Sequence, residues 1–230
     1  MKNYAIILAS GSSNRFGGNI PKQFIKLDTE TVLEKSIKAF EINPNITDII
    51  VVTNPNYLEM TKELLGDKFS KLRNIITGGA TRQESSYNGV FSIKDNEGNV
   101  LIHDAARPFV TQEIINDCIE KLKTEKAVGV AINSADTIVK INLDGYIEEI
   151  PQRNFLKRIQ TPQGFHLEII KHAHDLARQD KTLLVTDDCG MVLHYNLAKI
   201  SIIPGDECNI KITNKSDITN FLHYSSDNMQ

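Results

Sequence analysis

Two cationic side chains, Arg15 and Lys22, lie in a polar segment that follows the first apolar run of the chain. The segment Ile7–Phe24 reads ILASGSSNRFGGNIPKQF, and its small residues run from Ala9 to Ser13. Small side chains let backbone N–H groups approach phosphate oxygens closely, and two cations could neutralise a triphosphate. The segment matches neither GxGxxG nor GxxxxGK[ST], so an ordinary polar loop is the alternative interpretation.

A carboxylate and an arginine follow a second apolar run, in the stretch HDAARPF. Asp104 falls where the predicted strand 99–105 ends, and Arg107 comes three residues later, just before Pro108. A carboxylate beside a triphosphate is a natural Mg²⁺ ligand. The alternative is a local ion pair between Asp104 and Arg107 that closes the loop. His103 is predicted to be a packed strand-end histidine rather than a ligand.

Two glycines open a third polar stretch, GGATRQES, over residues 78–85. They turn the chain and leave Arg82 and Ser85 at the N-terminus of a predicted helix, where anions bind well. The alternative is that Gly78 and Gly79 only make the turn and that Ser85 faces solvent.

Cations, hydroxyls and a carboxylate recur in the second half of the chain, where they could bind a second, phosphorylated substrate. These residues are Asp136, Thr137, Arg153, Thr161 and Lys211. Arginine suits bidentate capture of a phosphate. The alternative is a solvated, charged hairpin. His166, His172 and His174 are predicted to lie on a solvated helix, and no nucleophile set of the Ser–His–Asp or Cys–His kind is evident.

Short β-rich runs alternate with helix-like stretches and must position these groups. The predicted strands are 4–9, 48–53, 72–77, 99–105 and 127–133, and the helices between them are 31–43, 56–65, 84–93 and 111–124. This alternation predicts an α/β fold with a doubly wound, mostly parallel sheet covered on both faces. Ligands of such sheets bind outside the carboxyl ends of the strands, here the loops after Ala9, Thr77, His103 and Asn133.

The alternation ends at residues 136–152, where two β-rich runs flank NLDG, a hairpin signature. The hairpin is predicted to project from the body as an arm over about residues 134–152. It is either an ornament at the edge of the sheet or a dimer arm, and its exposed edges favour pairing. Helices 167–177 and 187–193, a strand at 199–204 and a final helix after NKSD are expected beyond it. No linker divides the chain, so residues 1–230 are predicted to form one domain.

Composition limits the function classes. A net charge of −3 gives no overall attraction to nucleic acid or to an anionic membrane, so neither is an expected partner. The three cysteines are far apart and suit a reducing cytoplasm. The sequence shows neither a signal peptide nor an apolar run of the roughly 18 residues that a membrane span needs.

The motifs LASGSSNRF…PKQF, GGATRQES, HDAARPF, ADTIVK, QTPQGF and NIKIT occur in this order. Together they resemble the 2-C-methyl-D-erythritol 4-phosphate cytidylyltransferases and the related ribitol-5-phosphate cytidylyltransferases, from about residue 3 to about residue 222. The resemblance implies a Rossmann-like nucleotidyltransferase fold that joins CTP to a polyol phosphate with Mg²⁺. It also implies a homodimer, because the hairpin arm in that family swaps onto a second subunit.

The resemblance further implies a role for each candidate residue. Arg15, Lys22 and Lys211 would be catalytic, by stabilising charge on the phosphates. CTP would contact Ala9, Ser10, Gly11, Ser12, Ser13, Gly79, Ala80, Ser85, Asp104 and Ala105, with Asp104 holding the metal. Arg107, Asp136, Thr137, Arg153, Thr161 and Lys211 would form the polyol-phosphate side, where Arg107 braces the loop and Arg153 serves the partner's site.

Three positions depart from the family pattern. Cys208 stands where an aspartate is common before NIK, Lys157 where tryptophan is common, and Ser13 where glycine is usual. The metal would then be held by Asp104 and the phosphates alone, or with Asp206 or Glu207. Methylerythritol phosphate is the favoured acceptor and ribitol 5-phosphate the alternative. A third hypothesis is a non-catalytic nucleotide-binding protein that keeps the fold.

Overall fold

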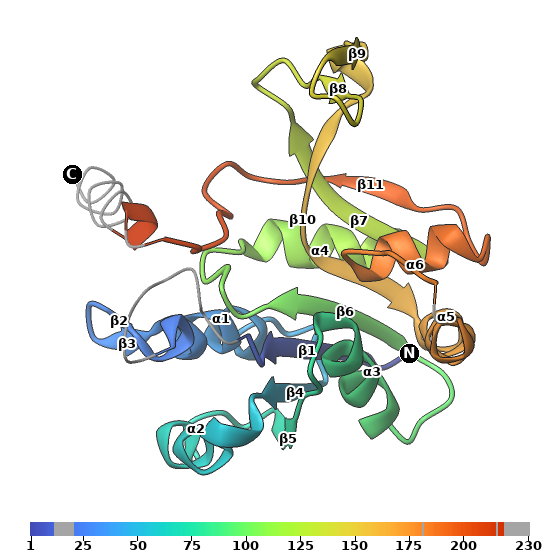
Figure 1. Cartoon of the computed structure of the whole chain (residues 1–230). Helices are drawn as coiled ribbons and strands as arrows, with labels where there is room; N and C mark the ends of the chain where they lie inside the picture. The colour runs from blue at the N-terminus through green and yellow to red at the C-terminus, as the bar shows by residue number, and fades with distance from the viewer. Residues whose placement is uncertain (12–20, 181, 215, 219–230) are drawn as a thin grey trace.

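The structure is a computed structural model that describes residues 1–11, 21–180, 182–214 and 216–218. A seven-stranded sheet with the order β11-β7-β10-β6-β1-β4-β5 crosses the molecule (Figure 1). Its strands are β1 Asn3–Ala9, β4 Asp48–Thr53, β5 Leu72–Thr77, β6 Asn99–Asp104, β7 Ala127–Asn133, β10 Lys157–His166 and β11 Ser201–Pro204. The pairs formed by β1, β4, β5 and β6 are parallel, as is β11 with β7, so the predicted α/β fold is confirmed.

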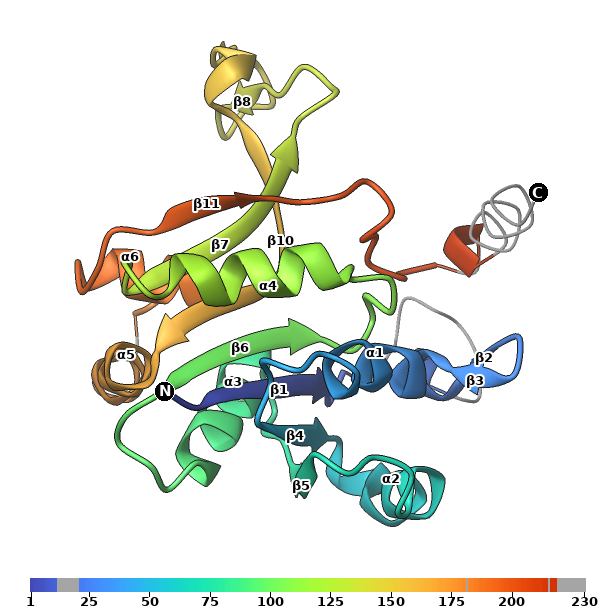
Figure 2. The ribbon, with the colours of Figure 1, turned by 180° about the vertical axis from the view of Figure 1, so that it is seen from behind.

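Helices cover both faces of the sheet, each over its own apolar cluster. On one face lie α1 (Val32–Glu41), α2 (Leu58–Leu65) and α4 (Gln112–Lys121), seen in front in Figure 2. On the other lie α3 (Arg82–Ser92), α5 (Leu167–Gln179) and α6 (Asp188–His194). All seven residues of β1 are buried, as expected of a central strand covered on both sides.

Threonines fix where three of the helices begin. The side chains of Thr31, Thr81 and Thr111 each accept a hydrogen bond from a backbone N–H of the first turn. At Thr81 the partner is Glu84, whose side chain returns the bond as a capping box. The capping box starts α3 at Arg82, two residues before the predicted start, and so places Arg82 in the first turn.

Strand β10 was not predicted. It runs antiparallel between β6 and β7, and its register shifts between Ile159 and Gln163. Its sequence, KRIQTPQGFH, is too polar for the continuous apolar run that marks a buried strand. The buried side chains of Gln160, Thr161 and Gln163 form hydrogen bonds with other segments, which makes the burial of this polar strand possible.

The predicted arm is present as a small hairpin of β8 (Lys140–Ile141) and β9 (Ile147–Glu149). It projects beyond the ends of β7 and β10 (Figures 1 and 2). In its turn, the side-chain oxygen of Asn142 accepts from the backbone N–H of Asp144 and Tyr146, and Gly145 has a φ of 85°. Shorter elements are β2 (Lys26–Leu27), β3 (Glu30–Thr31) and 3₁₀ turns at Lys22–Phe24, Pro55–Tyr57 and Arg153–Phe155. The final helix is described only at residues 216–218.

Candidate active site

A cavity of about 470 Å³ opens at the carboxyl ends of β1, β5 and β6. Nine of the predicted residues line it: Ala9, Ser10, Gly11, Lys22, Gly79, Ala80, Asp104, Ala105 and Lys211. The loops after Ala9, Thr77 and His103 therefore contribute, as predicted. The loop after Asn133 does not line this cavity; it leads into the arm and borders a separate hollow, and residues 211 and 213 line the cavity.

Two side-chain amides form hydrogen bonds with the first loop, at the end of β1. Gln23 Nε2 donates to the carbonyl of Ala9 at 2.9 Å, and Asn54 Nδ2 donates to the carbonyl of Ser10 at 3.4 Å. Lys22 Nζ donates to the carbonyl of Ile212 at 2.7 Å, which joins this segment to the loop that carries Lys211. Ser12, Ser13 and Arg15 lie outside the described residues.

Ser85 joins the first loop to the glycine loop. It is fully buried; its Oγ accepts from Ser10 Oγ at 2.7 Å and from the Gly79 N–H at 3.2 Å. A Cβ at Gly78 would lie 2.5 Å from Ser85 Oγ and 2.7 Å from Ser10 Cβ, so only glycine fits there. The alternative in which Ser85 faces solvent is therefore wrong. Ser85 holds together two walls of the cavity.

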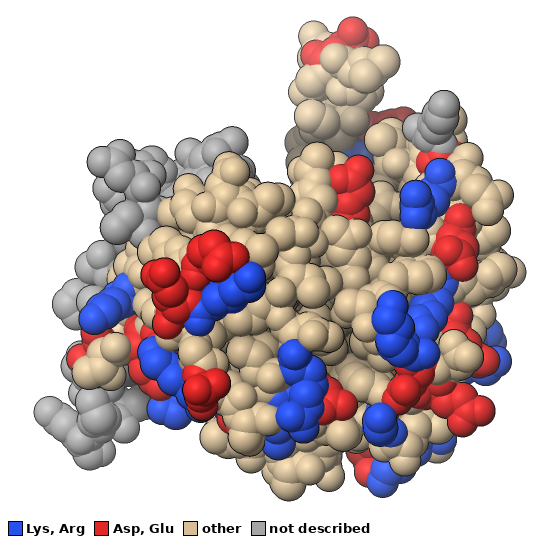
Figure 3. All heavy atoms as spheres, turned by 90° about the horizontal axis from the view of Figure 1, so that it is seen from below, with Lys and Arg blue, Asp and Glu red and all other residues tan. Residues whose placement is uncertain are grey.

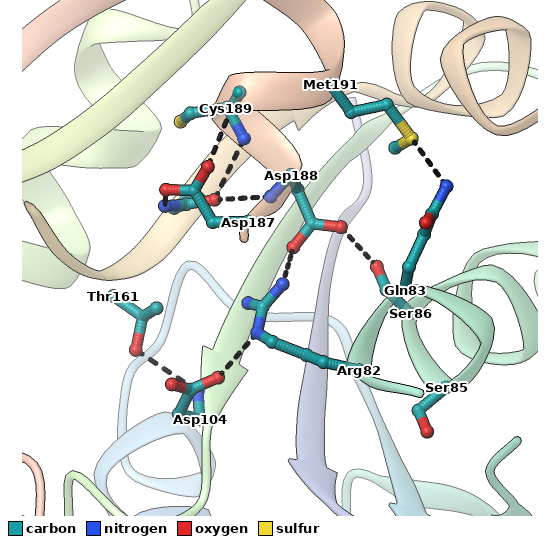
Figure 4. A network of polar contacts seen from close by, with 12 residues as sticks. Arg82, Gln83, Ser85, Ser86, Asp104, Thr161, Asp187, Asp188, Cys189 and Met191 are labelled. Atoms are coloured by element: carbon teal, nitrogen blue, oxygen red, sulfur yellow. Dashed lines mark hydrogen bonds and ion pairs between the residues drawn. The ribbon is translucent and has the colours of Figure 1, made fainter. Parts of the chain in front are cut away.

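Asp104 lies between two cations. Its Oδ1 accepts from Arg82 Nε at 3.2 Å, a contact drawn in Figure 4, and its Oδ2 accepts from Lys211 Nζ at 2.6 Å. Burial alone would raise the pKa of Asp104, but the charges of Arg82 and Lys211 hold this pKa far below its usual range. Asp104 is thus a carboxylate that is ionised at neutral pH, at the cavity wall. The suggested ion pair of Asp104 with Arg107 is replaced by these two contacts.

Arg82 also lines the cavity, although the sequence had suggested only that it lies at a helix N-terminus. Its Nη1 donates to Asp188 Oδ2 at 2.7 Å, while its Nε contacts Asp104. Burial would lower the pKa of Arg82, but Asp188 and then Asp104 raise it, so the guanidinium stays charged. The sequence signal for Arg82 is its position in the first helical turn after the two glycines. Its partners Asp104 and Asp188 lie 22 and 106 residues away along the chain.

Two buried side chains, Thr161 and His103, and the half-buried Arg107 support the Asp104 loop. The backbone N–H of Asp104 donates to Thr161 Oγ1 at 3.1 Å, and Thr161 Oγ1 lies 3.1 Å from His103 Nδ1. Burial lowers the pKa of His103 to about 4, so its ring is neutral, and Nε2 contacts the carbonyl of Arg107 at 2.9 Å. Arg107 Nη1 donates to the carbonyl of Asn209 at 2.6 Å, which braces the loop before Lys211. The prediction of a packed His103 is confirmed.

Comparisons with known proteins agree with this geometry. The family profile of 2-C-methyl-D-erythritol 4-phosphate cytidylyltransferase matches residues 4–224. The chain belongs to this family. An enzyme of that name from Thermobifida fusca is 39% identical over 222 residues, which span 93% of this chain and 89% of that one.

A second relative and a solved structure extend the comparison. The bifunctional ribulose 5-phosphate reductase/CDP-ribitol pyrophosphorylase of Haemophilus influenzae is 38% identical over 222 residues, 94% of this chain and 47% of its own. The crystal structure of 4-diphosphocytidyl-2C-methyl-D-erythritol synthase from Anaerococcus prevotii is 28% identical and has a TM-score of 0.87, covering 98% of this chain and 96% of that chain. The fold and the nucleotidyltransferase class of this enzyme are therefore shown.

The remaining predicted residues of this cytidylyltransferase lie on or beside the arm. Asp136, Thr137 and Arg153 are exposed and do not line this cavity. Arg153 Nη1 donates to the carbonyl of Ala135 at 3.3 Å, beside a separate hollow lined by residues 133–135 and 153–154. A single subunit thus does not bring these three residues to Lys211 and Asp104.

The described residues offer Asp104 as a carboxylate for a metal ion, and hold no group of three or more His, Cys, Asp or Glu residues able to enclose one. The two other suggested carboxylates are engaged elsewhere. Asp206 Oδ1 accepts from the Cys208 N–H at 2.7 Å, and Glu207 accepts both hydrogen bonds of Arg158 Nη2. A metal at Asp104 would therefore need oxygens from a ligand.

Charges of both signs are mixed over the face shown in Figure 3, where no broad basic surface forms. This mixture of charges agrees with the net charge of −3. Among the described residues, no helix has both the length and the apolar character needed to cross a membrane.

Proposed function

We propose that this enzyme joins CTP and 2-C-methyl-D-erythritol 4-phosphate to give the CDP-linked polyol and pyrophosphate. The observation that carries the proposal is the ionised Asp104 between Arg82 and Lys211, in a cavity that Lys22 also lines. This set suits a triphosphate, because three cations, Arg82, Lys22 and Lys211, line the cavity together with one carboxylate. The acceptor follows from the name of the family and of the Thermobifida fusca relative.

The chemistry needs no protein nucleophile. An oxygen of the acceptor's phosphate attacks the α-phosphorus of CTP, the new P–O bond forms, and the bond to pyrophosphate breaks. Phosphate is already ionised near pH 7, so no general base is required. Lys22 and Lys211, with Arg15, would stabilise the charge that builds up around the α-phosphorus, and the two loops would hold CTP in line for attack.

We infer that Mg²⁺ is the cofactor and that Asp104 holds it together with phosphate oxygens. One carboxylate plus substrate phosphates is the usual arrangement for this ion, and a carboxylate kept ionised in the cavity fits it. When bound, the ion neutralises phosphate charge. Lys211, now 2.6 Å from Asp104, would be released to contact a phosphate.

The cytosine would lie near Gly79 and Ala80, which line the cavity on a loop that Ser85 fixes. Thr161 and Arg107 would support the acceptor side through Asp104 and the Asn209 loop.

A homodimer would bring Asp136, Thr137 and Arg153 of one subunit to the other's cavity. The arm supports this proposal because it exposes a set of apolar side chains, namely Ile138, Val139, Ile141, Leu143, Tyr146, Ile147 and Ile150. We also propose a cytoplasmic location, which suits the three cysteines, none of which is in a disulfide.

Ribitol 5-phosphate is the second candidate acceptor. It is favoured by the relative from Haemophilus influenzae, whose name includes a CDP-ribitol pyrophosphorylase, and by Cys208 before the NIK motif. The chemistry at the α-phosphorus would be the same.

The test is pyrophosphate release with CTP and Mg²⁺, run in parallel on the two polyol phosphates. Preference for methylerythritol 4-phosphate by at least tenfold in kcat/KM is expected. Preference for ribitol 5-phosphate would assign the second function. CTP binding without turnover on either acceptor would overturn both and support the non-catalytic hypothesis.

A further inference from the structure

A second carboxylate, Asp188 at the start of α6, is buried behind the cavity and is only 1% exposed. Figure 4 shows its two oxygens facing different partners: Oδ2 accepts from Arg82 Nη1 at 2.7 Å, and Oδ1 accepts from Ser86 Oγ at 2.5 Å. Its backbone N–H donates to Gln163 Oε1 at 3.1 Å. Two hydrogen bonds therefore hold the carboxylate, and a third holds the backbone of the same residue.

His174 of α5 completes this cluster. Its Nε2 lies 3.3 Å from Ser86 Oγ and 3.8 Å from Asp188 Oδ1, and the side chain is 1% exposed. Burial lowers the pKa of His174 to about 4, so its ring is neutral and carries one N–H. Because the Ser86 hydroxyl donates to Asp188, its oxygen can accept this N–H from His174, which aligns the hydroxyl.

The prediction of a solvated His174 was wrong, although His172 is exposed as expected. The buried side of α5 is formed by Ile170, Ala173, His174 and Ala177, at the i, i+3, i+4 and i+7 spacing of one helix face. A histidine on that face is buried whatever its polarity, and it must then find a partner.

Arg82 connects the cluster of Asp188, Ser86 and His174 to the cavity. Arg82 and Ser86 are four residues apart on α3 and so share one face of that helix. The guanidinium has one carboxylate, Asp104, at the cavity and another, Asp188, behind it. Its Nη2 is buried and has no hydrogen-bond partner within the described part of the chain, so a donor remains for a ligand. A long arginine side chain keeps one orientation only if its partners are fixed.

We propose that Ser86 and His174 are positioning residues for CTP: they fix the Asp188 carboxylate, which aims Arg82 at the triphosphate. Neither residue lines the cavity, so each acts through another side chain. The inference rests on the proposed function, since it takes CTP as the ligand of the cavity.

The test compares Ser86→Val with Ser86→Thr, two side chains of nearly equal volume that differ by the hydroxyl. The dissociation constant of CTP with Mg²⁺ is measured by calorimetry without acceptor. We expect the Val variant to bind CTP about tenfold more weakly than the Thr variant, as for the loss of a hydrogen bond to a charged group. His174→Leu should weaken binding less, by about threefold, because its contact with Asp188 is indirect.

A double-mutant cycle shows whether the hydroxyl acts through Arg82. In an Arg82→Met background, the difference between Val and Thr at position 86 should disappear. Persistence of that difference would overturn the positioning role. The control is Ser36→Ala on α1, a buried serine whose Oγ has no hydrogen-bond partner among the described residues; its CTP affinity should stay unchanged.

The outcomes separate this inference from the proposed function. Failure of the wild-type enzyme to bind CTP would overturn the proposed function. Wild-type binding together with equal affinities of the Ser86→Val and Ser86→Thr variants would overturn only the positioning role.

Discussion

Replacing Asp104 by asparagine tests the charge arrangement of the cavity most directly. The substitution keeps size and shape but removes the negative charge between Arg82 and Lys211. Of the two terminal side-chain atoms of asparagine, one is an N–H₂ donor. It would therefore face Arg82 or Lys211, each of which is also a hydrogen-bond donor. Both the stability of the fold and the handling of CTP should therefore suffer.

The size of the stability loss follows from burial. Removing one partner of a buried ion pair costs about 3–5 kcal/mol. Arg82 keeps its contact with Asp188, and the Lys211 side chain is 38% exposed and can be hydrated, so the loss should be near the lower limit. Turnover should fall by about 10²- to 10³-fold, as when a preorganised electrostatic contact in an active site is removed.

Pyrophosphate release at saturating CTP and acceptor measures turnover, and urea unfolding at pH 7 measures stability. The matched control is Asp48→Asn, which breaks a pair with Arg73 whose arginine side chain is 59% exposed. That variant should lose less than about 1 kcal/mol, and its turnover should not change.

Turnover of the Asp104→Asn variant within threefold of the wild-type value would refute the role assigned to this carboxylate. Equal stability losses in the Asp104→Asn and Asp48→Asn variants would refute the argument from burial.

Three further predictions concern other parts of the molecule. Lys22→Ala should lower kcat/KM by about 10²-fold or more, and near-normal kinetics would refute its role at the phosphates. His103 and His174 have pKa values of about 4 in the folded chain, against 6.5 when unperturbed. As the pH falls, these histidines therefore become protonated in the unfolded chain before they do so in the folded chain. The free energy of unfolding should thus fall as pH drops from about 6.5 to 4, by up to about 1.4 kcal/mol per pH unit for each histidine, and His174→Leu should halve that slope in urea titrations. Aspartate at both Ile141 and Ile147 should shift sedimentation from dimer to monomer; an unchanged dimer would exclude the arm as its interface.

The sequence alone determined the repeating elements and the loops that carry chemistry. An apolar run such as residues 4–9 can be recognised from the local sequence, because a strand covered on both faces is apolar along its length. Thr111 marks the start of α4 because the capping hydrogen bond spans only three residues. The ordered motifs then indicated the family. Ligands of such sheets bind at the carboxyl ends of the strands, and on this basis the loops that carry Ser10, Gly79 and Asp104 were expected to form one site, as they do.

Tertiary structure decided which of these groups touch. Asp104 contacts Arg82 and Lys211 across 22 and 107 residues of chain, and Arg82 contacts Asp188 across 106. A local pattern cannot encode such pairs, so the nearer Arg107 was the plausible partner from sequence. The polar strand β10 and the burial of His174 were not predicted, for the same physical reason. A polar group can be buried only if it has hydrogen-bond partners, and only the folded chain supplies them.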